Sequence, residues 1–289
     1  SPLEMAQDLA SKPDTDWQDL MFGPALMQNY ALSVKGGGKY STYYNSVGYT
    51  NQDGVMKGTN YQRYTLQSKQ DFKKGIFQAG TNVVLTYDQS NPLYSVIRGG
   101  MVGHTLQAIP TWEQYDENRT GGYGGLYGDV VNLTHPLGMV DDNLMKRYSD
   151  NVKIFANAYV SVELMKGLKY KLNLTPDFQF YRYNSYEGLF DFGLAKHDIT
   201  AVTEQQTRTR NILVENLLTF DRTFGDHKVS ALVGYTYQDS RYRYMQGSGQ
   251  GMPTGITEID AASQGFDKGY RLYKGRLYIN RNEKTVSYI

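Results

Sequence analysis

Apolar and polar residues alternate with a period of two along most of the chain from about Leu26 onward. In residues 151–164 every second residue is apolar, and the residues between them include Lys153, Asn157 and Glu163. The same alternation returns in residues 76–88, 168–182, 209–223 and 227–243. Each run is much longer than the strands of soluble proteins, which average about five or six residues. Strands of this length are typical of tilted spans through a membrane.

Nine segments carry strand patterns, and a tenth strand is expected to begin near Thr285. The expected strands are 27–35, 39–50, 61–72, 76–88, 151–164, 168–182, 209–223, 227–243 and 269–280. The links at 36–38, 73–75, 165–167, 224–226 and 281–283 are short, the link at 51–60 is of medium length, and those at 89–150, 183–208 and 244–268 are long. Tight turns at one end and long loops at the other are typical of outer-membrane barrels. The sequence therefore predicts an all-β fold, an antiparallel transmembrane β-barrel with long extracellular loops.

The expected strands do not close such a barrel. The first short link follows the first strand, so an oppositely directed strand should precede it, but residues 1–25 show no strand pattern. An open sheet of nine or ten strands has two unpaired edges, which lipid does not tolerate. We therefore expect the chain to supply part of a larger barrel.

The composition narrows the classes of function. Lys and Arg number 30 against 29 Asp and Glu, so the net charge of +1 gives no reason to expect nucleic acid as a partner. Cysteine is absent, which excludes disulfides, thiolate metal sites and a cysteine nucleophile. The mean hydropathy of −0.56 excludes a bundle of membrane-spanning helices but not a barrel. Many of the 26 tyrosines stand near the ends of expected strands, as in the aromatic girdles of barrels.

The long link at 89–150 holds the candidate ligand-binding residues. Trp112, Tyr115, Tyr123 and Tyr127 are suited to stack on sugar rings, because aromatic faces match the apolar face of a pyranose. The alternative is that these rings anchor the long loop to its own barrel or to a lid protein. The glycine-rich run at 120–129 lacks the Gly-Lys-Ser/Thr ending of a phosphate loop and indicates a flexible surface loop.

No catalytic or metal site is expected. The candidate carboxylates of the same loop are Glu113, Asp116, Glu117, Asp141 and Asp142. Solvated loop residues explain them better than the acid and base of a glycosidase. Asp14, Asp16 and Asp19 resemble a calcium loop only weakly, because neither the turn glycine nor the distal glutamate is in register. We therefore expect no metal ion, no cofactor and no catalysis.

Two blocks of sequence read T-D-W-Q-D-L-M-F at 15–22 and M-Q-N-Y-A-L-S-V at 27–34. Both resemble SusC/RagA-type TonB-dependent transporters of Bacteroidetes. Further blocks lie at 41–44, 47–49, 52–58, 61–64, 166–169, 216–220, 223–227, 234–237 and 274–277. They keep the family's order over nearly the whole chain, and only the segments at 91–150 and 187–206 lack them.

This resemblance implies an outer-membrane importer of glycan oligosaccharides or peptides. The family's barrel has 22 strands around an N-terminal plug, works through TonB and is capped by a SusD-like surface lipoprotein. On this basis residues 1–25 are the end of the first extracellular loop. Residues 26–289 are then a partial barrel of about nine to ten strands with a long loop at about 89–150, and they meet outer-membrane lipid. The plug and the segment that contacts TonB have no counterpart in this sequence.

A second hypothesis remains open from the residues alone. Long twisted hairpins also occur in soluble all-β proteins, and a tyrosine-rich face can bind sugars instead of lying at a membrane interface. The alternative is therefore a soluble or surface-attached carbohydrate-binding β protein. Neither hypothesis names the cargo or the oligomeric state.

Overall fold

The computed structural model describes residues 10–93, 100–125, 133–193, 195–252 and 272–288, with backbone only for the last range. Most of these residues are in strands. The strands of the large sheet are β1 (Met27–Gly37), β2 (Ser41–Asp53), β3 (Asn60–Lys74), β4 (Phe77–Asn91), β5 (Met145–Met165), β6 (Leu168–Glu187), β9 (Ala201–Phe224), β10 (His227–Gln250) and β11 (Leu272–Tyr288). The smaller elements are α2 (Trp17–Met21), α3 (Gly100–Gln107), the 3-10 helix η1 (Gly138–Val140), β7 (Phe190–Asp191) and β8 (Lys196–His197).

The nine long strands form one antiparallel sheet in the order β1-β2-β3-β4-β5-β6-β9-β10-β11, so every strand pairs with its neighbours along the chain. This arrangement confirms the predicted antiparallel barrel wall. The predicted break at 281–283 and the tenth strand near Thr285 are wrong, because β11 runs through both without interruption. Its pairing with β10 shifts register beside Tyr242. Residues 281–283 therefore lie next to an irregularity in a continuous strand and do not form a turn.

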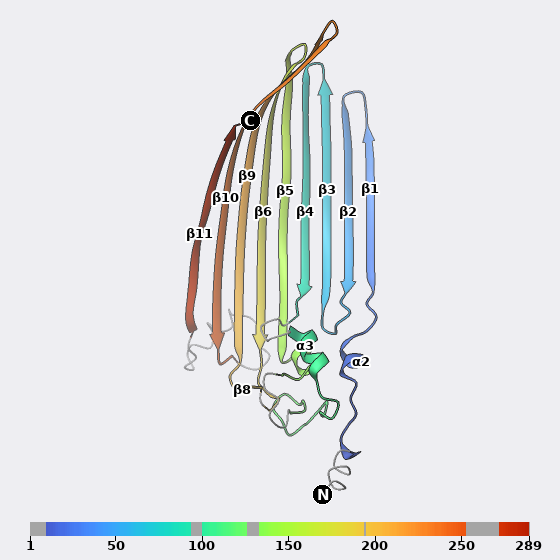
Figure 1. The fold of residues 1–289 in the computed structure, drawn as a ribbon, viewed down its shortest axis with the longest axis vertical. Helices are drawn as coiled ribbons and strands as arrows, with labels where there is room; N and C mark the ends of the chain where they lie inside the picture. The colour runs from blue at the N-terminus through green and yellow to red at the C-terminus, as the bar shows by residue number, and fades with distance from the viewer. Residues whose placement is uncertain (1–9, 94–99, 126–132, 194, 253–271, 289) are drawn as a thin grey trace.

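All the tight turns lie at one end of the sheet, called here the turn end, and all the long connections lie at the other, the loop end (Figure 1). Three of the turns contain a glycine with positive φ, namely Gly75, Gly167 and Gly225. A two-residue hairpin turn needs this left-handed conformation, which only glycine adopts without strain. The alternation of short and long links was thus predicted correctly for the described strands.

Strand register places the predicted apolar faces on the same side of the sheet, called here the apolar face. Tyr30 pairs with Tyr49, Tyr49 with Tyr64, and Tyr64 with Tyr87. Tyr87 pairs in turn with Val152 of β5. The apolar side chains of this face are exposed, for example Leu32 at 73% and Val233 at 63%. A sheet face covered in exposed apolar side chains has the character of a lipid-facing barrel surface.

The opposite side, called here the polar face, carries hydrogen-bonded amides and carboxylates. Asn157 Nδ2 donates to Asn173 Oδ1 at 2.8 Å, and Asn173 Nδ2 donates to Glu215 Oε2 at 2.8 Å. Tyr159 OH donates to Asp71 Oδ1 at 2.9 Å. These bonds cross from strand to strand, so the polar face is a connected surface of donors and acceptors.

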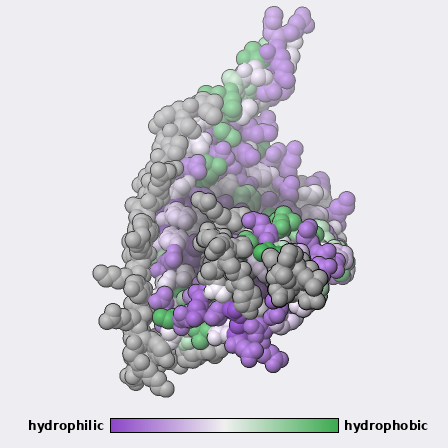
Figure 2. Space-filling view, turned by 60° about the horizontal axis from the view of Figure 1, so that its bottom comes forward, coloured by the Kyte–Doolittle hydropathy of each residue, from purple (hydrophilic) through white to green (hydrophobic). Residues whose placement is uncertain are grey.

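A hydrophobic core lies at the loop end, beyond the strands. Its buried members, called here the loop-end core, are Trp17, Met21, Met56, Met101, Trp112, Leu133, Leu137, Met139, Met145, Phe190 and Phe192. They come from the segment before β1, from the β2–β3, β4–β5 and β6–β9 connections, and from the start of β5. Figure 2 brings this end forward and shows hydrophilic residues over much of the described loop surface, with hydrophobic patches between them. Among the described residues, no helix has the length and apolarity to cross a membrane.

Candidate functional site

The short helix α2 anchors the N-terminal segment to the loop-end core. Asp16 is its N-cap, and its carboxylate accepts from the backbone N–H groups of Gln18 and Asp19 at 3.0 Å each. This capping directs Trp17 into the core, where its indole N–H donates to the carbonyl oxygen of Ile109 at 2.9 Å. Helix capping therefore explains Asp16.

His135 lies at the centre of the aromatic part of this core. Its ring contacts Trp17 edge to face, with centroids 4.9 Å apart, and also packs against Tyr123 and Phe192. Nδ1 accepts from the backbone N–H of Gly138 at 3.3 Å, so Nε2 carries the proton and faces the carbonyl oxygen of Glu113 at 3.3 Å. Burial lowers the pKa of His135 to about 4, and the imidazole is neutral at physiological pH.

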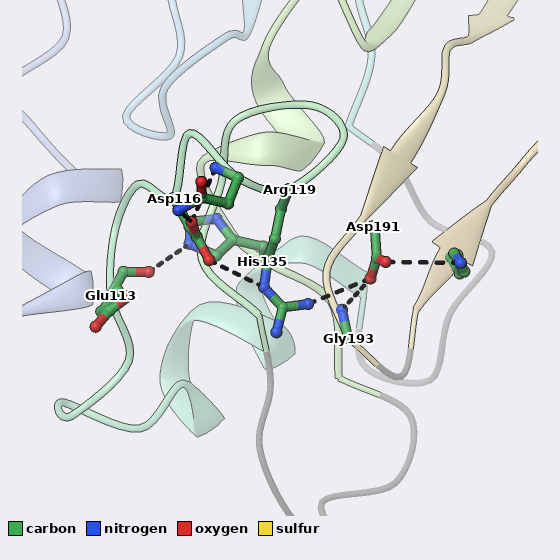
Figure 3. Close-up of polar contacts among 8 residues, drawn as sticks. Glu113, Asp116, Arg119, His135, Asp191 and Gly193 are labelled. Carbon is green, nitrogen blue, oxygen red and sulfur yellow. Dashed lines mark hydrogen bonds and ion pairs between the residues drawn. The ribbon is translucent and has the colours of Figure 1, made fainter.

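Arg119 connects two loops that are distant in sequence (Figure 3). Its Nε lies 3.2 Å from Asp116 Oδ2, and its Nη1 lies 3.3 Å from Asp191 Oδ1 in the β7–β8 hairpin. Asp191 also accepts from the backbone N–H of Gly193 at 2.9 Å, and this bond with the cations of Lys196 and Arg119 lowers the pKa of its carboxyl. The hairpin is thus held to the long loop by a partly buried charge network.

The four predicted ligand-binding residues have different environments. Trp112 is 4% exposed and belongs to the loop-end core, in an edge-on contact with Trp17. Tyr123 is partly buried, and its hydroxyl donates to Asp141 Oδ2 at 2.9 Å. Tyr115 is 62% exposed and packs against Tyr123. Tyr127 lies outside the described residues. Trp112 and Tyr123 therefore act as anchors of the loop, and Tyr115 presents its ring to solvent.

Two carboxylates of the long loop have structural partners. Asp116 pairs with Arg119, and Asp141 accepts from Tyr123 and from the backbone N–H of Asn143. In the described part of the chain, no three His, Asp or Glu side chains gather as they would around a metal ion. The arrangement is a set of interlocked loops at one end of the sheet.

Sequence reasoning missed the roles of His135, Arg119 and Trp17 in this site. Each makes contacts across loops that have no periodic pattern, so spacing along the chain does not reveal them. The only indication in the sequence is that His135 stands in the apolar stretch at 133–139, where a histidine is expected to be buried and neutral.

An antiparallel sheet with one exposed apolar face, one hydrogen-bonded polar face and its long connections at one end defines the wall of a β-barrel of the outer-membrane type. No family model matches the chain. The chain is 30% identical over 238 residues to the TonB-dependent receptor P3 of Formosa agariphila, covering 78% of this chain and 23% of that protein. It is 26% identical over 153 residues to the TonB-dependent receptor SusC of Bacteroides thetaiotaomicron, covering 52% of this chain and 15% of that protein.

Solved structures give the same result for the fold. The structure of the RagAB peptide transporter matches with a TM-score of 0.70 and 18% identity, covering 96% of this chain and 30% of that chain. The RagAB peptide importer in its closed-closed state matches with a TM-score of 0.69, also at 18% identity, over 95% of this chain and 30% of that chain. These comparisons confirm the resemblance to SusC/RagA-type TonB-dependent receptors. The chain spans about a quarter of the length of the first curated relatives it matches.

Proposed function

We propose that this chain is part of the barrel wall and outer loops of a SusC-like TonB-dependent importer in the outer membrane of a Bacteroidetes-like bacterium. The observation that carries the proposal is the difference in polarity between the two sheet faces. Exposed apolar side chains cover one face, and a ladder of hydrogen-bonded amides and carboxylates crosses the other. This difference suits a wall between lipid and a wet lumen.

The proposal assigns a place to each part of the chain. The apolar face meets outer-membrane lipid, the polar face lines the lumen, and the loop end lies outside the cell. Residues 1–25 are the end of the first extracellular loop, and residues 26–289 are the partial barrel. The position of α2 beside the long loop supports this assignment, because residues 15–22 pack in the loop-end core.

The partners follow from the same proposal. A SusD-like surface lipoprotein caps the loop end, and TonB acts through the N-terminal part of the importer. The cargo is a glycan oligosaccharide or a peptide, the latter being what the RagAB structures are described as importing. Tyr115 is the loop aromatic best placed to contact cargo or lid, because its ring is exposed.

The exposed apolar face argues against the alternative of a soluble carbohydrate-binding protein. Side chains such as Leu32, Val47 and Val233 are at least half exposed in a continuous sheet, and water does not tolerate such a surface. Catalysis is not part of the proposal, because Asp116 and Asp141 are held by structural partners and the relatives are named as receptors.

The native polypeptide that carries this chain provides the first test. The 238 aligned residues are 23% of receptor P3, which is therefore about 1,000 residues long. An antibody raised against this chain should detect a polypeptide of about this size in outer-membrane fractions. Only detergent should extract this polypeptide from the membrane. A band at 32.8 kDa in the soluble fraction would contradict the proposal.

Uptake tests the importer directly. Deletion of the gene should abolish growth on one oligosaccharide or peptide source and spare growth on glucose, and the gene should restore growth only when TonB is present. Pull-down of the native polypeptide should recover a lipoprotein. Unchanged growth on all oligomeric sources would overturn import as the function while leaving the location intact.

A further inference from the structure

The apolar face changes character toward the loop end, where arginines replace apolar residues on three neighbouring strands. On β9 the positions of this face are apolar or neutral from Phe220 to Ile212, and Arg210 and Arg208 follow. On β6 the apolar positions end at Phe180, and Arg182 follows. The arginines therefore begin where the apolar band ends, at the level expected for lipid headgroups.

Two of these arginine pairs are directly opposed across β9 and β10. Arg210 pairs in register with Arg241, and Arg208 pairs with Arg243. Like charges directly opposite one another in an antiparallel sheet are destabilising, because their Cβ atoms are only about 5 Å apart. Each pair therefore requires a compensating anion.

The chain supplies this anion for the first pair. Asp239 is 6% exposed, and its Oδ2 lies 2.6 Å from Arg210 Nη2 and 3.3 Å from Arg241 Nε. One carboxylate thus bridges both guanidinium groups and offsets one of their two charges, in a nearly dry position on the sheet surface.

The second pair has no such carboxylate among the described side chains. Arg208 and Arg243 are both exposed, and Arg208 lies over the ring of Phe180 with its Cζ 5.2 Å from the centroid. The neighbouring Arg182 is already paired with Asp150 at 2.8 Å. A hollow of about 540 Å³ lies around the second pair, and its lining includes the Arg182–Asp150 pair together with Val152, Phe180, Arg208, Arg243 and Met245.

We propose that Arg208 and Arg243 bind the phosphate of an outer-leaflet glycolipid headgroup on the outside of the barrel wall. A phosphate between the two guanidinium groups would compensate the charge of this pair, as Asp239 does for Arg210 and Arg241. Arginine suits this role because its planar fork makes paired charge-assisted hydrogen bonds with phosphate oxygens.

The position of the hollow favours a lipid over a free anion. Its floor and sides include Val152, Phe180 and Met245, which give the remainder of the headgroup and the start of an acyl chain an apolar surface. The hollow opens on the apolar face, at the edge of the band that we assign to lipid. This inference rests on the proposed outer-membrane location.

The test uses the native polypeptide purified from outer membranes in mild detergent, with bound phosphorylated glycolipid measured by native mass spectrometry. The double variant R208Q/R243Q should retain roughly tenfold less glycolipid, as expected for loss of charge-assisted hydrogen bonds. The matched control K35Q/R63Q removes the same charge from the polar face and should retain wild-type amounts. D239N should bind an additional phosphate, because it leaves Arg210 and Arg241 uncompensated.

Three results would overturn the proposal. The first is that R208Q/R243Q retains as much glycolipid as the wild type, and the second is that the control K35Q/R63Q loses as much as R208Q/R243Q. The third is that millimolar inorganic phosphate displaces all the bound phosphate and no lipid is recovered. Heat-modified gel mobility confirms that each variant folds. Cargo uptake is measured in parallel, so a failure of import with retained glycolipid would count against the proposed function alone.

Discussion

The indole of Trp17 and the imidazole of His135 meet edge to face, with ring centroids 4.9 Å apart and an interplanar angle of 86°. The contact joins the segment before the first strand to the long loop between β4 and β5. Both rings are nearly inaccessible to solvent, so the protonation state of the histidine affects how well the loop-end core packs.

We expect the loop-end core to weaken as the pH falls below about 6.5. The pKa of His135 is lowered to about 4 in the folded state, against about 6.5 when unfolded. The unfolded loop therefore binds a proton first, and stability is lost progressively between these two values, by roughly 3 kcal/mol in all. Burial also lowers the pKa of His104, which acts in the same direction.

Hydrogen exchange of the native polypeptide in outer-membrane vesicles measures this effect. Peptides from residues 100–125 and 133–145 should exchange faster at pH 5 than at pH 7, after correction for the intrinsic rate. The variant H135Q should show a smaller difference, whereas H227Q, at an exposed turn, should leave it unchanged. An identical pH difference in wild type and H135Q would refute the assignment.

Variants of Trp112 and Tyr115 should distinguish anchoring of the long loop from ligand binding. W112A should destabilise the loop-end core by about 3–5 kcal/mol, because it removes a large buried ring, and should expose the loop to added protease. Y115A should leave protease resistance unchanged, because its ring is mostly in solvent. If Tyr115 contacts cargo, Y115A should weaken binding in a titration with the imported oligomer. Protease sensitivity in Y115A would place this ring among the anchors instead.

The ion pair between Arg119 and Asp191 should hold the β7–β8 hairpin to the long loop. Its partners lie 3.3 Å apart and are partly buried, so D191N and R119Q should each increase cleavage within the hairpin. The pKa of Asp191 is lowered in the folded protein, so this stabilisation is present above about pH 4 and is lost as the carboxyl becomes protonated. The double variant D191N/R119Q should be cleaved no faster than the more sensitive single variant. Additive increases in cleavage would show that the two residues act separately.

Gly80 should not tolerate a side chain. A Cβ at this position would lie 2.5 Å from Tyr159 Cε1 and 2.6 Å from Asp71 Oδ1, because the tyrosine ring crosses the glycine to reach the aspartate. G80V should lower the barrel's thermal stability in a heat-modified gel assay, by about 1–3 kcal/mol for a forced shift of this kind. G48A is the control, since its Cβ would meet no atom closer than 3.8 Å. Equal melting of both variants would contradict the prediction.

The strand faces were predictable because lipid imposes a strict alternation on every position that crosses it. Register confirms this from Tyr30 through Val152. The same rule explains the errors. The alternation is lost in residues 203–210, which are all polar, so β9 was expected from residue 209 but begins at Ala201. In the same way β10 was expected to end at 243 but reaches Gln250.

The loop-end core was beyond prediction for a related reason. Burial there depends on contacts between loops, such as Thr15 with Trp112, which the sequence separates by 97 residues. No period marks such contacts. The sequence offers the aromatic residues of the long loop as candidates, but the division of Trp112, Tyr123 and Tyr115 into buried anchors and an exposed ring needed the three-dimensional structure.

Four separate connections share the loop-end core, and this has a mechanical consequence. The segment before β1 also bonds to the β2–β3 connection, through the N–H of Lys57 to the carbonyl of Met21 and the N–H of Gly23 to the carbonyl of Val55. None of these connections can move alone without breaking the packing of the buried side chains that it shares with the others. We therefore expect this part of the loop end to move as one unit, so that a partner contacting any part of it would displace the whole.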